Sequence, residues 1–150
     1  MAAIHTYAFV LAALCVASSM QTEFQPCAGK PAPSAVKLVG CEKLPCNLVR
    51  GTNAEAFVDF SVLANSNTLK PEVHVTLGAI TTPYPLPQQD ACKDLTKGSC
   101  PLQKGQSATY HMKMPVEKAY PKVDLTIQLA LVDQNKNVQA CFKIPAKVVD

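Results

Sequence analysis

Apolar and polar residues alternate along several stretches of this 150-residue chain, and this period of two constrains the fold more than any other feature. Successive side chains of a strand point to opposite faces, so each stretch is expected to bury one face. The stretches are 54–64, 72–79, 110–114, 123–132 and 138–149. Their inward-facing residues are predicted to be Ala56, Val58, Phe60, Val62, Val73, Val75, Leu77, Tyr110, Met112, Met114, Val123, Leu125, Ile127, Leu129, Leu131, Val138, Ala140, Phe142 and Ile144.

This alternation predicts an all-β fold. Turn-forming residues such as those of 133–137 (DQNKN) separate the stretches, and no stretch has a sustained helical period. Five or more strands in a chain of this size favour an antiparallel β-sandwich of two sheets. The chain has no tryptophan, which an antibody-type domain carries in its core. The sandwich is therefore expected to be immunoglobulin-like with a different disulfide frame.

The N-terminal residues 1–19 are expected to form a secretory signal peptide. Ala8 to Ala17 is a short apolar run followed by small residues, and no charged side chain occurs before Glu23. The run is short for a membrane span, and cleavage is expected between Ala17 and Met20. We therefore expect an exported, monomeric protein with one domain, residues 20–150.

Six of the seven cysteines follow the expected signal peptide. An even number of cysteines in an exported chain predicts three disulfides. Cys41 with Cys46, and Cys92 with Cys100, are close enough in sequence to close small loops, and Cys27 then pairs with Cys141. The alternative, zinc binding, is disfavoured because no histidine lies near these cysteines.

Charge and motifs argue against several other functions. The net charge of +3 comes from scattered lysines, without the arginine clusters and stacking aromatics typical of nucleic-acid binding. No hydrolase, zinc-protease or phosphate-loop motif occurs, and His74 and His111 alternate with apolar residues as surface histidines of strands do. No catalytic residue, metal ligand, cofactor or nucleic-acid partner is therefore expected, and the chain is predicted not to be an enzyme.

Three prolines occupy alternate positions in residues 81–92 (TTPYPLPQQDAC). Proline has no backbone N–H, so Pro83, Pro85 and Pro87 remove the donors from one side of an extended segment and protect that edge from further strand pairing. The residues between them, Tyr84 and Leu86, point the other way and are presented together. A rigid surface loop would have the same composition.

Hydrophobic residues make up 48% of the chain, and the predicted inward faces are mostly aliphatic. An ordinary packed core accounts for most of them. The alternative is that two disulfide-braced sheets stand far enough apart to leave a cavity for an apolar ligand. Composition alone does not decide between the two.

Several segments occur in an order that resembles one protein family. They are PYPLPQQDAC before the fourth of the six cysteines, CPLQKGQSATY from the fifth, then MPVEKAYP, and finally ACFKIPAKVV. From about Glu23 to Val149 the chain resembles the ML (lipid-recognition) family, close to its Niemann-Pick type C group of secreted or lysosomal sterol carriers, as an arthropod-like member. The resemblance implies an immunoglobulin-like sandwich with a hydrophobic cavity between the sheets, and it agrees with the three disulfides.

The resemblance also implies a set of site residues. In the sterol-carrier group the aromatic residue of the proline-rich segment stands at the cavity mouth, across from a valine and a Tyr-Pro pair, with one wall position matched here by Leu77. Leu86 and Val123 are added from the alternation. The expected lipid-binding residues are Leu77, Tyr84, Leu86, Val116, Tyr120, Pro121 and Val123. Tyr84 replaces the usual phenylalanine of vertebrate carriers and Thr82 an aliphatic residue, so this mouth is more polar and suited to a ligand head group.

The function implied is that of a soluble extracellular carrier. It would reversibly encapsulate a sterol or fatty-acid-like lipid and transfer it, with a transient membrane or receptor contact. Lysosomal members are sorted through N-glycans, and this chain has no Asn-x-Ser/Thr sequon, which favours secretion. One alternative is an innate-immune module that binds microbial glycolipid through a cationic rim of Lys93, Lys97, Lys118 and Lys122. Another is an adhesion sandwich that holds no lipid.

Overall fold

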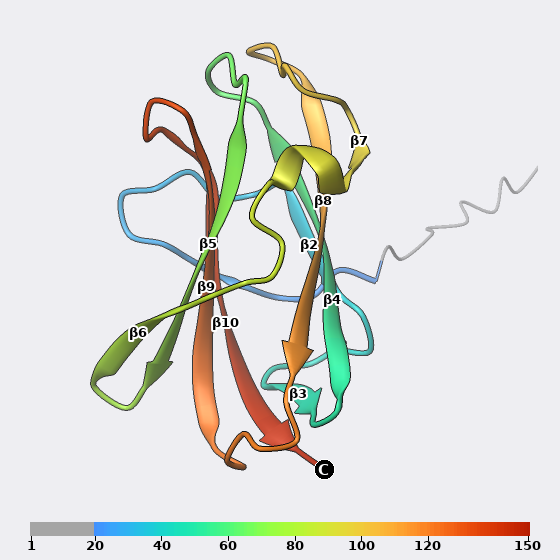
Figure 1. The fold of residues 1–150 in the computed structure, drawn as a ribbon, viewed down its shortest axis with the longest axis vertical. Coiled ribbons are helices and arrows are strands. Elements are labelled where there is room, and N and C mark those ends of the chain that lie inside the picture. Colours follow the sequence, from blue (N-terminus) through green and yellow to red (C-terminus); the bar gives the residue numbers. More distant parts are fainter. Residues whose placement is uncertain (1–19) are drawn as a thin grey trace, which may run out of the picture.

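Two β-sheets pack face to face in the structure, a computed structural model that describes residues 20–150 (Figure 1). The expected signal peptide, residues 1–19, lies outside the described residues. The first sheet has the order β1 (Gln25–Pro26), β10 (Val138–Val149), β9 (Asp124–Asp133), β5 (Leu69–Leu77) and β6 (Ile80–Tyr84), with β3 (Cys46–Val49) also beside β10. The second has the order β2 (Ala35–Leu38), β4 (Thr52–Ser61), β8 (Ser107–Val116) and β7 (Leu95–Lys97). A short 3₁₀ helix, η1 (Ala91–Asp94), precedes β7.

The β-sandwich predicted from the alternation is confirmed, with one exception to its antiparallel order. All named strand pairs are antiparallel except β3 with β10, which run parallel, with Ala146 opposite Cys46. The strand expected over 54–64 ends at Ser61, because Val62 bonds to Gly105 and Gln106 of a loop, and the Leu63 and Ala64 N–H groups donate to the Gln139 side chain.

The inward faces meet in one continuous core. The predicted inward residues of β4 and β8, such as Phe60 and Tyr110, are buried, as are Leu129 and Leu131 of β9. Burial weakens toward one end of the sandwich, where Val75, Leu77 and Leu125 are partly or largely exposed. The sheets therefore pack tightly over most of their area and separate at one end. Val138 does not face inward as predicted: β10 has a register shift between Val138 and Ala140, and Val138 packs against the separate cluster that contains Cys141.

All three predicted disulfides are present. Their Cα–Cα distances are 5.7 Å for Cys27–Cys141, 5.3 Å for Cys41–Cys46 and 5.7 Å for Cys92–Cys100. Cys27 and Cys141 belong to a small buried cluster with Ala130 and Val132, whose side chains alternate with the inward-facing residues of β9. The long bridge therefore fastens the N-terminal segment to the outer face of the first sheet.

The proline-rich segment begins as the edge strand β6. Pro83 lies opposite His74 of β5, and within residues 20–150 β6 has no second neighbour in its sheet, which agrees with the expectation for a proline-bearing edge. After Tyr84 the chain crosses to the second sheet (Figure 1). There the side-chain oxygen of Gln88 accepts hydrogen bonds from the Tyr110 hydroxyl, at 3.1 Å, and from the Lys113 backbone N–H, at 2.9 Å. The segment thus bridges the two sheets along one side of the sandwich.

A buried polar network closes the opposite end of the sandwich. The carboxylate of Asp133 accepts hydrogen bonds from the backbone N–H groups of Asn135 and Asn137, at 2.8 and 2.9 Å, and from the Gln139 side-chain amide, at 3.0 Å. Gln139 in turn accepts from the Leu63 N–H at 2.8 Å. Burial raises the pKa of the Asp133 carboxyl, but these hydrogen bonds outweigh it and hold the pKa below its usual value.

Asp133→Asn is expected to lower the free energy of unfolding by about 2 kcal/mol at neutral pH, because an amide cannot satisfy all the donors that face this carboxylate. A carboxyl with a lowered pKa in the folded state adds stability above its unfolded pKa of about 3.9 and loses it as pH falls through the folded value. The gap between wild type and variant should therefore shrink in acid. Guanidinium unfolding of both proteins between neutral and acidic pH measures this difference in stability. A difference that does not change with pH would contradict the role given to the Asp133 carboxylate.

Candidate functional site

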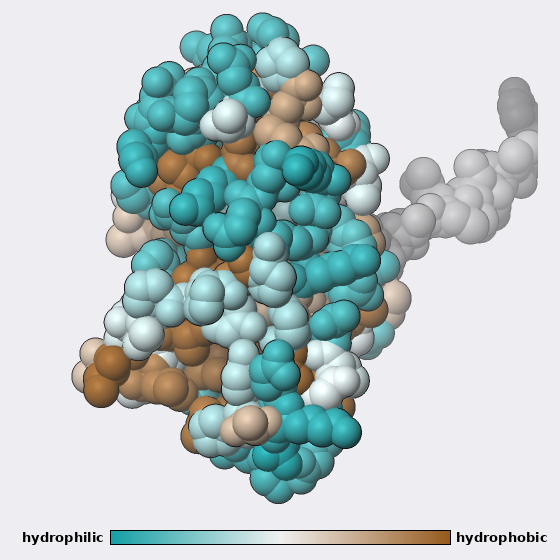
Figure 2. All heavy atoms as spheres, viewed as in Figure 1, coloured by the Kyte–Doolittle hydropathy of each residue, from teal (hydrophilic) through white to brown (hydrophobic). Residues whose placement is uncertain are grey.

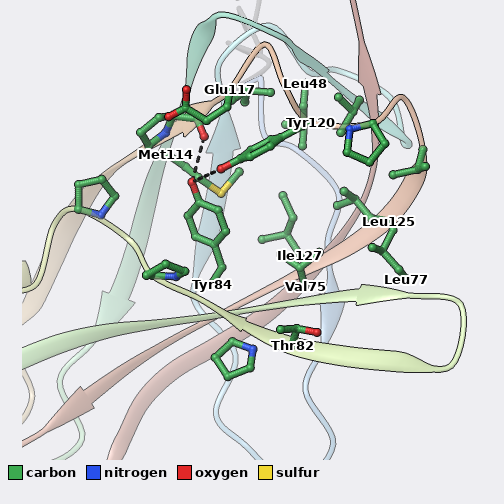
Figure 3. A pocket seen from close by; sticks show the side chains of 18 residues that line it. Leu48, Val75, Leu77, Thr82, Tyr84, Met114, Glu117, Tyr120, Leu125 and Ile127 are labelled. Carbon is green, nitrogen blue, oxygen red and sulfur yellow. Dashed lines mark hydrogen bonds between the residues drawn. The ribbon is translucent and has the colours of Figure 1, made fainter.

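A cavity of about 510 Å³ lies between the sheets at the end where they separate (Figure 3). It is bounded by the β5–β6 hairpin and by the connection from β8 to β9. Its lining is almost entirely apolar. The residues are Leu48, Val75, Leu77, Thr82, Pro83, Tyr84, Pro85, Pro87, Met114, Pro115, Val116, Glu117, Tyr120, Pro121, Val123, Leu125, Ile127 and Val148.

The burial of β5 shows how the cavity opens. Val73, Val75 and Leu77 share the inward face, yet Val73 is buried, Val75 is half-buried and Leu77 is 44% exposed. Leu125 of the neighbouring β9 is likewise only partly covered. Inward side chains of the first sheet thus progressively lose their packing partners, and the space they face is the cavity.

Six of the seven expected lipid-binding residues line this cavity. They are Leu77, Tyr84, Val116, Tyr120, Pro121 and Val123. Leu86 does not, since it is 3% exposed and packs in the main core. The reason is the crossing described above: β6 ends at Tyr84, so Leu86 no longer continues the strand face on which Tyr84 lies.

Other lining residues were not among the expected site residues. Met114, Leu125 and Ile127 were expected only to face inward, and the same period of two continued along β10 would have reached Val148. Leu48 comes from the short strand β3, whose pairing with the distant β10 leaves no local signal.

Two tyrosine hydroxyls meet across the cavity. The Tyr84 hydroxyl donates to the Pro115 carbonyl at 3.1 Å and lies 3.1 Å from the Tyr120 hydroxyl (Figure 3). Tyr84 belongs to the first sheet and Pro115 to the second, so this contact joins the sheets at their open end. Burial, the hydrogen bond with Tyr120 and the negative charge of Glu117 all raise the pKa of the Tyr84 hydroxyl well above its ordinary value, which keeps the phenol neutral.

The lysines proposed as a cationic rim do not reach the cavity. Lys93, Lys97, Lys118 and Lys122 are all exposed, and none lines it. The Lys122 ammonium lies 2.7 Å from a carboxylate oxygen of Asp150. The positions of these four lysines therefore do not support a glycolipid site that uses their charges.

An apolar hairpin tip lies beside the cavity. Leu77 lines the cavity and is largely exposed, and Ile80, at the start of β6, is 71% exposed. Figure 2 shows this tip as a hydrophobic projection at the lower left of the molecule, where Figure 1 places the β5–β6 hairpin. The molecule therefore presents apolar surface to solvent at the edge of its apolar cavity.

Side chains suited to catalysis or metal binding do not gather at this site. Among residues 20–150 there is no cluster of His, Cys, Asp and Glu that would hold a metal ion. His74 and His111 are half-buried and do not line the cavity. His111 stacks on Phe57 and has its Nε2 3.2 Å from a carboxylate oxygen of Glu55. Within the same residues, no helix has the length and apolar character of a membrane span.

Comparison with known proteins places these features in a family. Residues 21–148 match the ML domain family. The chain is 34% identical over 145 residues to NPC intracellular cholesterol transporter 2 homolog a of Drosophila melanogaster, covering 95% of this chain and 97% of that one. It is 31% identical over 141 residues to NPC intracellular cholesterol transporter 2 of Mus musculus, covering 93% of each.

A solved structure has the same fold. The Niemann-Pick type C2 protein from Japanese carpenter ant superposes with a TM-score of 0.75 at 24% identity, covering 85% of this chain and 99% of that chain. The sequence match, which spans nearly all of the described residues, and the shared two-sheet architecture lead to one assignment. The chain belongs to the ML domain family.

Proposed function

We propose that the protein is a secreted, soluble carrier that reversibly encapsulates a sterol or fatty-acid-like lipid between its two sheets and transfers it without catalysis. The observation that carries the proposal is the apolar cavity of about 510 Å³, which lies within the size range of small-molecule sites. The cholesterol-transporter names of the relatives in fly and mouse point to the same class of ligand. Residues 1–19 act as the export signal in this proposal.

The energetics suit a carrier that must also release its cargo. Burying about 400 Å² of lipid surface yields roughly 10 kcal/mol at about 25 cal/mol per Å². Loss of rigid-body freedom and ordering of the mouth cost several kcal/mol, so the dissociation constant is expected near micromolar or somewhat tighter. Pro83, Pro85 and Pro87 stiffen one wall and keep the ordering cost small.

Transfer requires contact with a donor or acceptor. The hairpin tip with Leu77 and Ile80 suits that contact, because it is apolar, exposed and adjacent to the cavity. In this proposal a transient docking of the tip on a membrane or a receptor brings the cavity mouth next to the surface that gives or takes the lipid. The carrier itself works as a monomer.

Protein purified from its native source is expected to carry about one extractable lipid per chain. Mass spectrometry of an organic extract identifies the lipid, and titration of the delipidated protein with a fluorescent sterol measures its affinity. Heat-unfolded protein serves as the control for non-specific adsorption. No lipid in the extract, together with no saturable sterol binding, would point instead to an adhesion sandwich.

A further inference from the structure

The phenol pair in the cavity offers hydrogen-bond acceptors and no free donor. A carbonyl oxygen can only accept, so Tyr84 must donate its single hydroxyl proton to Pro115. The 3.1 Å contact between the two phenols then requires Tyr120 to donate to Tyr84. Both hydroxyl protons therefore take part in hydrogen bonds within the protein. The two lining phenols are thus left with acceptor sites only, mainly those on the Tyr120 oxygen.

The charge in the cavity lining is negative. Glu117 is the only charged side chain among the described residues that line the cavity. After burial and the contact with Tyr120, its negative charge is a further cause that raises the pKa of the Tyr84 hydroxyl. An ionised carboxylate entering here would meet a like charge and acceptors only.

Three cations near this end of the cavity lie outside its lining, and two of them are paired with Asp150. Arg50 pairs with Asp150 and donates to the backbone carbonyl of Tyr120 at 3.2 Å, and Lys122 also pairs with Asp150. The aliphatic part of Lys118 packs beside Gly51, where Cε lies 3.0 Å from the position that a Cβ would take. None of these three cations lines the cavity, where it would balance the negative charge of a ligand carboxylate.

We infer that the cavity selects lipids whose head group is a neutral hydrogen-bond donor, such as a sterol or fatty-alcohol hydroxyl, over lipids that end in an ionised carboxylate. The hydroxyl would donate to the Tyr120 oxygen or to Glu117, which a carboxylate cannot do. This inference rests on the proposed carrier function and narrows its ligand class. Glu117 and Tyr120 are the residues that determine the preference.

Oleyl alcohol and oleate test the inference, because they share one hydrocarbon chain and differ only in the head group. Each competes at neutral pH with the apolar dye N-phenylnaphthylamine, whose fluorescence reports occupancy of the cavity. The alcohol is expected to displace the dye at a concentration about tenfold lower than oleate. Equal displacement, or a preference for oleate, would overturn the inference while leaving the carrier function in place. If neither lipid displaced the dye, the carrier function itself would fail, and the inference with it.

Two substitutions separate the two causes of the preference. Glu117→Gln should improve displacement by oleate several-fold, since the repelling charge is gone and an amide donor is added. Tyr120→Phe should weaken binding of oleyl alcohol and leave binding of oleate unchanged, since the phenol oxygen that accepts the hydrogen bond is lost. Glu42→Gln is the matched control, because Glu42 is exposed and does not line the cavity. An oleate affinity that Glu117→Gln leaves unchanged would remove Glu117 from the selection.

Discussion

Val116→Phe is expected to abolish binding of a fluorescent sterol or fatty acid, with a loss of affinity of at least about a hundredfold. Val116 ends β8, is 3% exposed and lines the cavity. Because Val116 is almost fully buried and borders the cavity, the larger phenyl ring is expected to occupy the space proposed for the lipid. Titration of the delipidated variant with the fluorescent probe measures the effect.

The fold of this variant should survive. The backbone of Val116 is paired with Thr52 of β4, and phenylalanine is well accepted in strands. A native circular dichroism spectrum is therefore expected. Val39→Phe introduces the same ring at a position that is 53% exposed and does not line the cavity, and it should bind lipid normally. Normal binding by Val116→Phe would remove this residue from the site.

Removal of the long disulfide is expected to be the most destabilising change to the fold. Cys27 and Cys141 are 114 residues apart, and closing a loop of this length in the unfolded chain is worth about 4 to 5 kcal/mol. A loss of that size is about a third to nearly all of the 5 to 15 kcal/mol that typically separates folded and unfolded domains. Guanidinium unfolding of Cys27→Ala/Cys141→Ala under non-reducing conditions measures it.

The bridge between Cys92 and Cys100 provides the comparison. Its ends are only 8 residues apart, so the same chain-entropy argument gives about 2.5 kcal/mol. The difference between the two double variants, about 2 kcal/mol, tests whether loop length sets the stabilisation. Equal losses would mean that local packing around the sulfurs matters more than the constraint on the unfolded chain.

The core of this fold was predictable because its signal is local. In β4, β8 and β9, alternate side chains such as Val58, Met112 and Leu129 enter the core as the sequence pattern indicates. The disulfide pairing was also predictable, since two pairs are close in sequence. By contrast, β3 spans four residues and pairs in parallel with β10, and nothing near Leu48 in the sequence signals a partner a hundred residues away.

The candidate site was less predictable than the core. The resemblance to the ML family placed Tyr84, Val116 and Tyr120 around one space, which alternation alone could not do. It did not indicate Glu117, which lines the cavity and whose proposed role depends on where the neighbouring cations lie. Leu86 was wrongly placed in the cavity because the alternation was continued past Tyr84, where strand β6 ends.

The strand β10 pairs with β1, β3 and β9, and it follows all three in the chain. During synthesis these earlier segments have no neighbour on that side until Val138–Val149 leaves the ribosome. Until then the nascent protein exposes unpaired backbone and apolar faces. We therefore expect the need for chaperones during synthesis to depend on when β10 is made. A chain truncated just before β10 is expected to be degraded.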